Sequence, residues 1–328
     1  MRENTPRLSR RAALLGAAGA ALAVTGPLSA GPALASAPML GATRLSHYRF
    51  ALGEFEVTVI HDGFIALDGP FPIFGTDQDP QAVEALAADH FLPQKRMTIG
   101  FSPVIVNTGA ELILFDTGNG AGRRPDAGQL RTLLAGAGYA PEQIDIVVLT
   151  HFHPDHIGGL MEDGTPAFPN ARYVTGRVEY DFWSPQEKAS GPTERVGKLV
   201  QANVVPFADK MTFLDDNQDV VSGITAVSAF GHTPGHLAFH LESAGKRMMV
   251  TGDTANHYII SLQKPDWHVR FDMDKDAAAA ARRKIFGMIA ADRIAFSGYH
   301  MPFPNLGFVE AHGDGFRYAP ASYQFDVH

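Results

Sequence analysis

The sequence contains no cysteine among its 328 residues. Disulfide bonds, thiolate metal ligands and a cysteine nucleophile are therefore excluded, so any bound metal must be held by histidine and carboxylate side chains. Positive charge is also scarce, because 27 Lys and Arg face 35 Asp and Glu and leave a net charge of −8 at pH 7. This charge disfavours nucleic acid as a partner and favours a small molecule.

The apolar run that follows Arg10 and Arg11 is too short and too interrupted by Ala and Gly to form a stable membrane anchor. The Ala-Leu-Ala sequence at 33–35 then provides a small-residue cleavage site. These features predict that residues 1–35 are a twin-arginine-type signal peptide and that the mature protein is periplasmic or secreted. An ordinary secretory signal or an uncleaved anchor is the alternative, because Ala13 stands where a large apolar residue is expected.

The remaining residues, 36–328, contain no short repeat or extended linker that would mark a separate module. Alternating and apolar runs predict strands at 55–60, 103–107, 111–116, 146–150, 172–175, 224–229, 237–241, 247–251 and 294–297. Helices are predicted at 79–92, 129–137 and 275–291. This order indicates an α/β fold, an αββα sandwich of two mixed β-sheets with helices on both outer faces.

Four potential metal ligands lie within six residues directly after the predicted strand 146–150: His151, His153, Asp155 and His156. Alternation along an extended segment puts two imidazoles on one side, and the following turn supplies a carboxylate and a third imidazole. A solvated histidine-rich loop is the alternative. Three further candidates beyond strand ends, His232, Asp253 and His300, favour a metal site.

These residues stand in motifs that resemble the metallo-β-lactamase superfamily: HFHPDHIGG at 151–159, HTPGH at 232–236 and TGDT at 251–254. The resemblance covers 36–328 and implies one hydrolase domain of that fold with two metal ions. By this resemblance His151, His153 and His232 hold one ion, Asp155, His156 and His300 hold the other, and Asp253 bridges the two. It also implies that Asp116, in LFDTG, orients a ligand histidine or the metal loop.

Two adjacent divalent ions generate a hydroxide from water near neutral pH and polarise the oxygen of an electrophilic centre. Asp155 or Asp253 can then transfer a proton to the leaving group. Nitrogen and oxygen ligands suit Zn²⁺, with Mn²⁺, Co²⁺ and Fe²⁺ as alternatives. We expect His236, which ends HTPGH, to brace the loop rather than to bind metal.

Segments outside the ligand motifs are similar to methyl parathion hydrolase and its lactone- or aryl-ester-cleaving relatives. They lie at 47–63, 137–145, 167–174 and 315–323 and include Trp183. Two segments depart from that pattern, because 117–128 contains two arginines but no aromatic residue, and 190–205 contains no aromatic residue either. Fewer side chains can therefore stack on an aryl group, and the candidates for substrate contact are Trp183, Phe64, Leu67, Asn256 and His257.

We therefore expect hydrolysis of a lactone or aryl ester, with organophosphate triester hydrolysis as the alternative. Asn256 stands three residues after Asp253, where acyl-homoserine lactonases have an assisting tyrosine, so that subgroup's mechanism does not carry over intact. More distant alternatives are an iron-dependent sulfur dioxygenase and a non-catalytic metal-binding protein. The oligomeric state stays open, with a homodimer as one option.

The signal peptide gives a first prediction. Replacement of Arg10 and Arg11 by lysine preserves charge, but it should retain the precursor in the cytoplasm, because an ammonium group cannot copy the guanidinium geometry. Cell fractionation followed by antibody detection measures how the protein is distributed between cytoplasm and periplasm. Export and trimming of the double-lysine protein at the parental level would exclude the twin-arginine route.

Overall fold

The computed structural model describes residues 37 and 39–326, so the predicted signal peptide at 1–35 lies outside the described residues. The chain from Arg44 onward forms one compact unit. The described residues before it, 37 and 39–43, are exposed and belong to no helix or strand. No helix in the described part of the chain is both long and apolar enough to cross a membrane.

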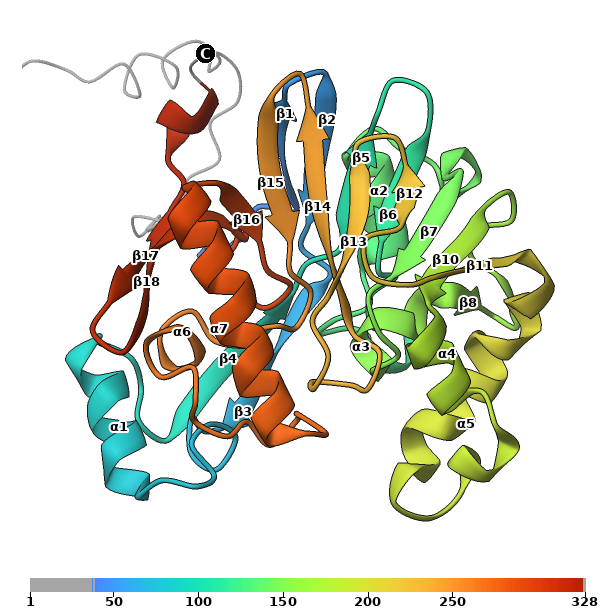
Figure 1. Ribbon diagram of the computed structural model, residues 1–328. Helices are drawn as coiled ribbons and strands as arrows, with labels where there is room; N and C mark the ends of the chain where they lie inside the picture. The colour runs from blue at the N-terminus through green and yellow to red at the C-terminus, as the bar shows by residue number, and fades with distance from the viewer. Residues whose placement is uncertain (1–36, 38, 327–328) are drawn as a thin grey trace, which may run out of the picture. The chain divides into compact units, whose positions relative to one another are not determined.

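Two seven-stranded sheets form the centre of the unit that begins at Arg44 (Figure 1). The first sheet has the order β1 (His47–Leu52), β2 (Phe55–Ile60), β5 (Val104–Asn107), β6 (Leu112–Phe115), β7 (Ile146–Leu149), β10 (Arg172–Gly176) and β11 (Met211–Leu214). Its pairs are antiparallel from β1 to β6 and parallel from β6 to β11. A small hairpin, β8 (Met161–Glu162) and β9 (Thr165–Pro166), stands apart from it.

The second sheet has the order β12 (Asp219–Val221), β13 (Ile224–Ser228), β14 (Leu237–Ser243), β15 (Lys246–Val250), β16 (Ala295–Ser297), β17 (Leu306–His312) and β18 (Gly315–Pro320). Only β15 and β16 pair in parallel within it, and the other neighbours are antiparallel. Both sheets are thus mixed, as the sequence predicts.

The described residues form seven α-helices. They are α1 (Pro80–Asp89), α2 (Leu130–Gly136), α3 (Pro154–Ile157), α4 (Arg177–Trp183), α5 (Glu194–Asn203), α6 (Ile260–Gln263) and α7 (Lys275–Asp292). Buried residues of α2, α4 and α5 pack against the first sheet, whereas α7 lies across the second (Figure 1). The predicted αββα sandwich is therefore confirmed.

The continuous apolar run of β7 follows from this layering. Ile146 and Val148 join the core between the two sheets, whereas Val147 and Leu149 join the core under the helices of the first sheet. Both faces of β7 are buried, so no position in it needs a polar side chain. The strand can therefore end abruptly in the polar sequence that carries the histidines.

The sequence did not predict the hairpin of β3 (Gly63–Asp68) and β4 (Arg96–Phe101). The two strands pair antiparallel although α1 lies between them in the chain, so no turn signal joins them. With α1 they enclose a separate small core that includes Phe74, Val83 and Ile99. Figure 1 shows this hairpin and α1 at the lower left and α4 and α5 at the lower right, with α3 between them.

The loops after β6 and β7 are in direct backbone contact. The backbone N–H of Thr117 donates to the carbonyl of His156 at 2.7 Å, and Gly159 N–H donates to Gly118 at 3.1 Å. A Cβ atom on Gly159 would lie 2.0 Å from the Thr117 carbonyl oxygen. Only glycine at 159 thus permits the histidine loop to pack against the loop that follows Asp116.

We predict that Gly159→Ala lowers the free energy of unfolding of the metal-saturated protein by about 2 kcal/mol, because the two backbones must move apart. Gly287→Ala is the matched control, since its Cβ would meet no atom within 4 Å in α7 and should stabilise by about 0.5–1 kcal/mol. Urea unfolding measures both variants. If the two variants have equal free energies of unfolding, the close contact between the two loops does not require glycine at 159.

Candidate metal centre

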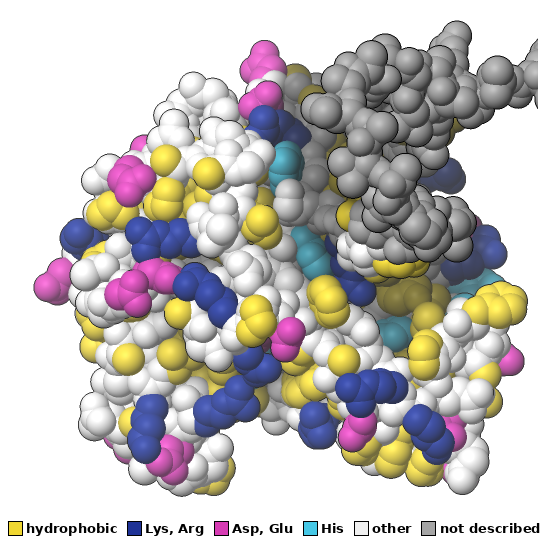
Figure 2. Space-filling view, turned by 180° about the vertical axis from the view of Figure 1, so that it is seen from behind, with side chains coloured by type: hydrophobic (Ala, Val, Ile, Leu, Met, Phe, Trp, Pro, Cys, Tyr) yellow, Lys and Arg dark blue, Asp and Glu magenta, His cyan; other side chains and the backbone are white. Residues whose placement is uncertain are grey.

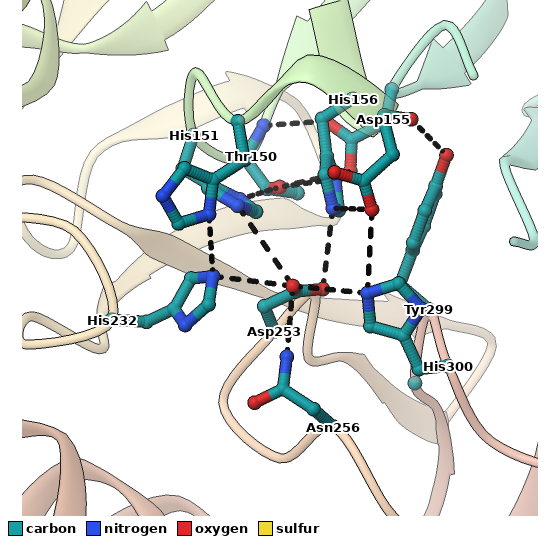
Figure 3. Close-up of polar contacts among 12 residues, drawn as sticks. Thr150, His151, Asp155, His156, His232, Asp253, Asn256, Tyr299 and His300 are labelled. Atoms are coloured by element: carbon teal, nitrogen blue, oxygen red, sulfur yellow. Dashed lines mark hydrogen bonds and ion pairs between the residues drawn. The ribbon is translucent and has the colours of Figure 1, made fainter. Parts of the chain in front are cut away.

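The predicted ligands converge at one edge of the sandwich. His151 and His153 follow β7, Asp155 and His156 lie in α3, and His232, Asp253 and His300 follow β13, β15 and β16 respectively. These strands end at neighbouring positions, so residues up to 149 positions apart in sequence meet in space (Figure 3). The loops at the strand ends thus build the site, while the sheets fix its position.

The ligand atoms form two groups. Those of His151, His153, His232 and Asp253 lie within 4.8 Å of one another, and so do those of Asp155, His156, Asp253 and His300. These are the two sets that the resemblance implies.

Asp253 belongs to both groups and lies between them (Figure 3). Its Oδ2 is 3.2 Å from Nε2 of His232 and 3.1 Å from Nε2 of His300. Its Oδ1 is 3.3 Å from Nε2 of His156. This carboxylate can therefore contact a cation in either group.

The donor set fits two divalent cations. Nε2 of His151, Nε2 of His156 and Oδ1 of Asp253 are buried without a hydrogen-bond partner. Buried polar atoms without a partner are costly, and one cation in each group would together satisfy all three. Each group combines imidazole nitrogens with carboxylate oxygens, which are ligand atoms that zinc and similar divalent ions accept.

The pKa values show how strongly these charges interact. Burial and the neighbouring His232 lower the pKa of His153 to about 3. Burial also acts to lower the pKa of His232, but the carboxylates of Asp253 and Asp272 outweigh it and raise that pKa to about 9. A proton on His232 would compete with a cation for the same atom, so metal binding must release it.

Two carboxylates, those of Asp116 and Asp272, accept hydrogen bonds from Nδ1 atoms of histidines in the ligand groups. Asp116 accepts from Nδ1 of His156 at 2.7 Å and from the backbone and hydroxyl of Thr150 at 2.8 Å. It thus contacts both a ligand histidine and the metal loop, the two roles expected of it. Asp272 accepts from Nδ1 of His232 at 2.8 Å, and each contact leaves Nε2 of the histidine facing the cation groups.

Sequence reasoning missed Asp272. The residue lies between α6 and α7, outside any recognised motif, and the buried Arg282 of α7 donates to its other oxygen at 2.9 Å. Only the fold brings this Arg–Asp pair behind His232. A buried aspartate next to an alanine-rich helix offers no signal in sequence that could have identified it.

Glu179 and Asp62 are two further buried carboxylates that hold the loops and that the sequence did not reveal. Glu179 accepts from the backbone of Phe152 at 2.9 Å, from the Thr233 hydroxyl at 2.7 Å and from the backbone of Gly235 at 2.9 Å. It therefore ties the HxHxDH loop to the HTPGH loop. Asp62 accepts from backbone N–H groups of Asn119, Gly128 and Leu130, and so anchors both ends of the segment between them.

His236 lies outside both ligand groups. Its Nδ1 donates to the carbonyl of Ala229 at 3.0 Å, and its Nε2 accepts from the backbone N–H of Asp253 at 3.1 Å. Both nitrogens are occupied by backbone groups, which agrees with the interpretation of His236 as a brace.

A cavity of about 420 Å³ opens onto the ligand groups. Leu67, one of the predicted substrate contacts, lines it together with Asp155 and Asp253. Ile65, Ile99 and Phe101 of the β3–β4 hairpin give it an apolar wall.

The other predicted substrate contacts lie elsewhere. Phe64, Asn256 and His257 line a second cavity of about 430 Å³ on the other side of His300. Asn256 donates from Nδ2 to Oδ2 of Asp253 at 2.9 Å, and Nδ1 of His257 accepts from two backbone N–H groups at the start of α6. Trp183 is only 2% exposed and packs in the core under the first sheet, so it lines neither cavity. The expectation for Trp183 is therefore corrected, because the buried face of α4 carries it inward.

We predict that Asp272→Asn weakens metal binding by about 10- to 100-fold, because it removes the negative charge that His232 and the buried Arg282 share. Competition with a chelator measures the affinity. Asp266→Asn is the control, since Asp266 pairs with Arg283 at the exposed surface of the same region. If both variants retain metal equally, Asp272 has no part in holding His232.

Comparisons with known proteins agree with this geometry. A family model of the metallo-β-lactamase superfamily matches residues 99–295. A probable metallo-hydrolase, YflN, of Bacillus subtilis (strain 168) is 25% identical over 184 residues, which span 51% of this chain and 68% of YflN. The N-acyl homoserine lactonase AttM of Agrobacterium fabrum (strain C58 / ATCC 33970) is 30% identical over 125 residues, 36% of this chain, and the match spans less than half of AttM, 44%.

Two solved structures are similar over almost their whole length. AidC, described as a dizinc quorum-quenching lactonase in complex with a product, is 28% identical with a TM-score of 0.77, and the match covers 85% of this chain and 98% of AidC. The hydrolase AbOPH is 26% identical with a TM-score of 0.77, covering 86% of this chain and 99% of AbOPH. The chain belongs to the metallo-β-lactamase superfamily and is a metal-dependent hydrolase.

Proposed function

We propose that the protein hydrolyses a lactone or aryl ester at two divalent metal ions, most simply zinc. The position of Asp253 between two complete ligand groups, next to an open cavity, carries this proposal. When bound, two such ions lower the pKa of a water molecule and polarise the carbonyl oxygen of the substrate. The similarity to AidC and AttM, both described as lactonases, supports a lactone as the substrate.

The cavity wall suits the apolar part of such a substrate. Ile65, Leu67, Ile99 and Phe101 present a continuous apolar surface from the β3–β4 hairpin to the ligand groups. An acyl chain or a small ring can be buried there, and the volume is that of a site for a small molecule. Aromatic stacking is limited to Phe101 and Phe271 in this cavity, which favours lactones and simple esters over bulky aryl phosphotriesters.

Asp155 is placed to transfer the proton to the leaving group. Its side chain is 22% exposed and lines the cavity, whereas that of Asp253 is 4% exposed beneath it. Burial acts to raise the pKa of Asp155, but His156 and His300 outweigh it and hold that pKa at about 2. The carboxylate is thus ionised and can accept a proton from water before passing it on.

The assisting tyrosine expected in acyl-homoserine lactonases is absent from the matching position of this protein. Asn256 occupies the position three residues after Asp253 and donates to Asp253 instead of facing the first cavity. The hydroxyl of Tyr299 donates to the carbonyl of Asp155 at 2.6 Å, and its ring packs on His156. Tyr299 therefore holds the α3 loop, and proton transfer depends on Asp155.

We predict that the protein, loaded with Zn²⁺, Mn²⁺ or Co²⁺, hydrolyses N-hexanoyl homoserine lactone or dihydrocoumarin faster than methyl parathion. Asp155→Asn should lower kcat about 10²- to 10⁴-fold on the alkyl lactone, whose alkoxide must be protonated as it leaves. The loss should be smaller on naphthyl acetate, whose leaving group is more acidic. Elemental analysis of the same samples checks that two metal ions remain bound.

Each contrary outcome has a distinct meaning. Equal losses on both substrates would limit Asp155 to a structural role at the metals. Faster turnover of methyl parathion would favour the organophosphate triester alternative. A single bound iron with no hydrolysis of any substrate would contradict the proposal and favour an iron-dependent dioxygenase.

A further inference from the structure

Three arginines line the cavity above the ligand groups. Arg123 ends the 3₁₀ turn η1 (Ala121–Arg123), Arg195 lies in the first turn of α5, and Arg270 lies in the loop between α6 and α7. Their side chains thus converge on one cavity from three separate segments. Figure 2 shows Lys and Arg side chains in the lower middle of the face seen from behind, with hydrophobic side chains beside them.

None of these three guanidinium groups has a carboxylate within ion-pair distance among the described residues. Charged sequence neighbours of two of them, Arg123 and Arg195, are paired with other residues instead. Arg124, next to Arg123, contacts Glu162 at 2.6 Å, and Glu194, next to Arg195, pairs with Lys198. The guanidinium carbon of Arg270 lies 5.3 Å from the centre of the Phe271 ring. The three arginines thus lack a carboxylate partner, although the chain as a whole has an excess of acidic residues.

The cavity is lined by charged side chains of both signs. Its acidic side chains are Asp155 and Asp253, and both belong to the ligand groups. No carboxylate other than these lines the cavity, so nothing in it neutralises the arginines. The cavity therefore combines the two ligand groups, an apolar wall and three arginines that belong to neither ligand group.

We propose that the substrate carries an oxyanion, such as a carboxylate, at the end remote from the bond that is cleaved, and that Arg123, Arg195 and Arg270 bind it. This proposal rests on the proposed hydrolysis and adds the class of substrate. A guanidinium group offers a planar pair of donors that matches a carboxylate, and all three arginines are exposed, so an incoming anion can reach them. The apolar wall then holds the part of the substrate between the two ends.

Binding and turnover test the proposal with matched compounds. Hexanoate and adipate have chains of equal length, but only adipate has a second carboxylate for the arginines. Calorimetry with the metal-loaded protein should show adipate binding about tenfold more tightly at low salt, beyond the roughly twofold effect of having two equivalent ends. In turnover, monophenyl adipate should exceed phenyl hexanoate in kcat/KM by about tenfold, mainly through KM, because a remote contact acts equally on ground and transition states.

The variants assign the preference to the arginines. Two ratios are measured: the affinity for adipate over that for hexanoate, and the kcat/KM of the anionic ester over that of the neutral ester. Each should fall about threefold in the variants Arg123→Gln, Arg195→Gln and Arg270→Gln. In the parent protein, 0.5 M salt should lower both ratios as well, because exposed charges are screened. Arg131→Gln is the matched control, because Arg131 is exposed on α2 and lies outside the cavity. This substitution changes the net charge by the same amount as the other three. Its ratios should equal those of the parent.

The outcomes separate this proposal from the proposed hydrolysis. Hydrolysis of phenyl hexanoate without any preference for the anionic compounds would overturn the anion site and leave the hydrolase intact. Preference for adipate without turnover of either ester would retain the anion site and overturn ester hydrolysis. A preference that survives in all three arginine variants would place the anion elsewhere and overturn the assignment.

Discussion

The buried carboxylate of Asp253 is the constraint on which the site depends. It lies between His232, His156 and His300 at 3.1–3.3 Å, and its Oδ1 has no hydrogen-bond partner. Such an arrangement of converging nitrogen and oxygen atoms is unfavourable in a folded protein unless a cation joins them. Every loop that reaches the site must therefore be held in place by contacts outside the ligand groups.

Those contacts are hydrogen bonds accepted by buried carboxyl groups that surround the ligand groups. Asp116 and Asp272 each fix the orientation of a ligand histidine, while Glu179 and Asp62 bind backbone N–H groups of the surrounding loops. Four buried carboxyl groups thus fix the geometry of the site and lie outside the two ligand groups. The arrangement explains how a loop-built site can be rigid, because the sheets supply the position and the carboxylates supply the orientation.

Substrate selection is built from different parts of the chain. The apolar wall comes from the β3–β4 hairpin, and the arginines come from η1, α5 and the loop before α7. None of these segments carries a metal ligand. Chemistry and selectivity are therefore separable in this fold, since the lining can change while the strand ends keep the ligands in place.

The sequence by itself determined the sandwich and most strands of its two sheets, and it predicted the seven residues that the structure brings together in two groups. The reason is local: buried strands such as β7 need continuous apolar runs, and ligands grouped at strand ends leave a short pattern such as HFHPDH. Tertiary structure alone decided which side chains reach the cavity. Trp183 faces the core, Asn256 faces Asp253, and Arg123 faces the cavity while Arg124 pairs with Glu162. Adjacent residues of the same type can have opposite environments, because side-chain direction and long-range partners depend on how distant segments pack rather than on the residue itself.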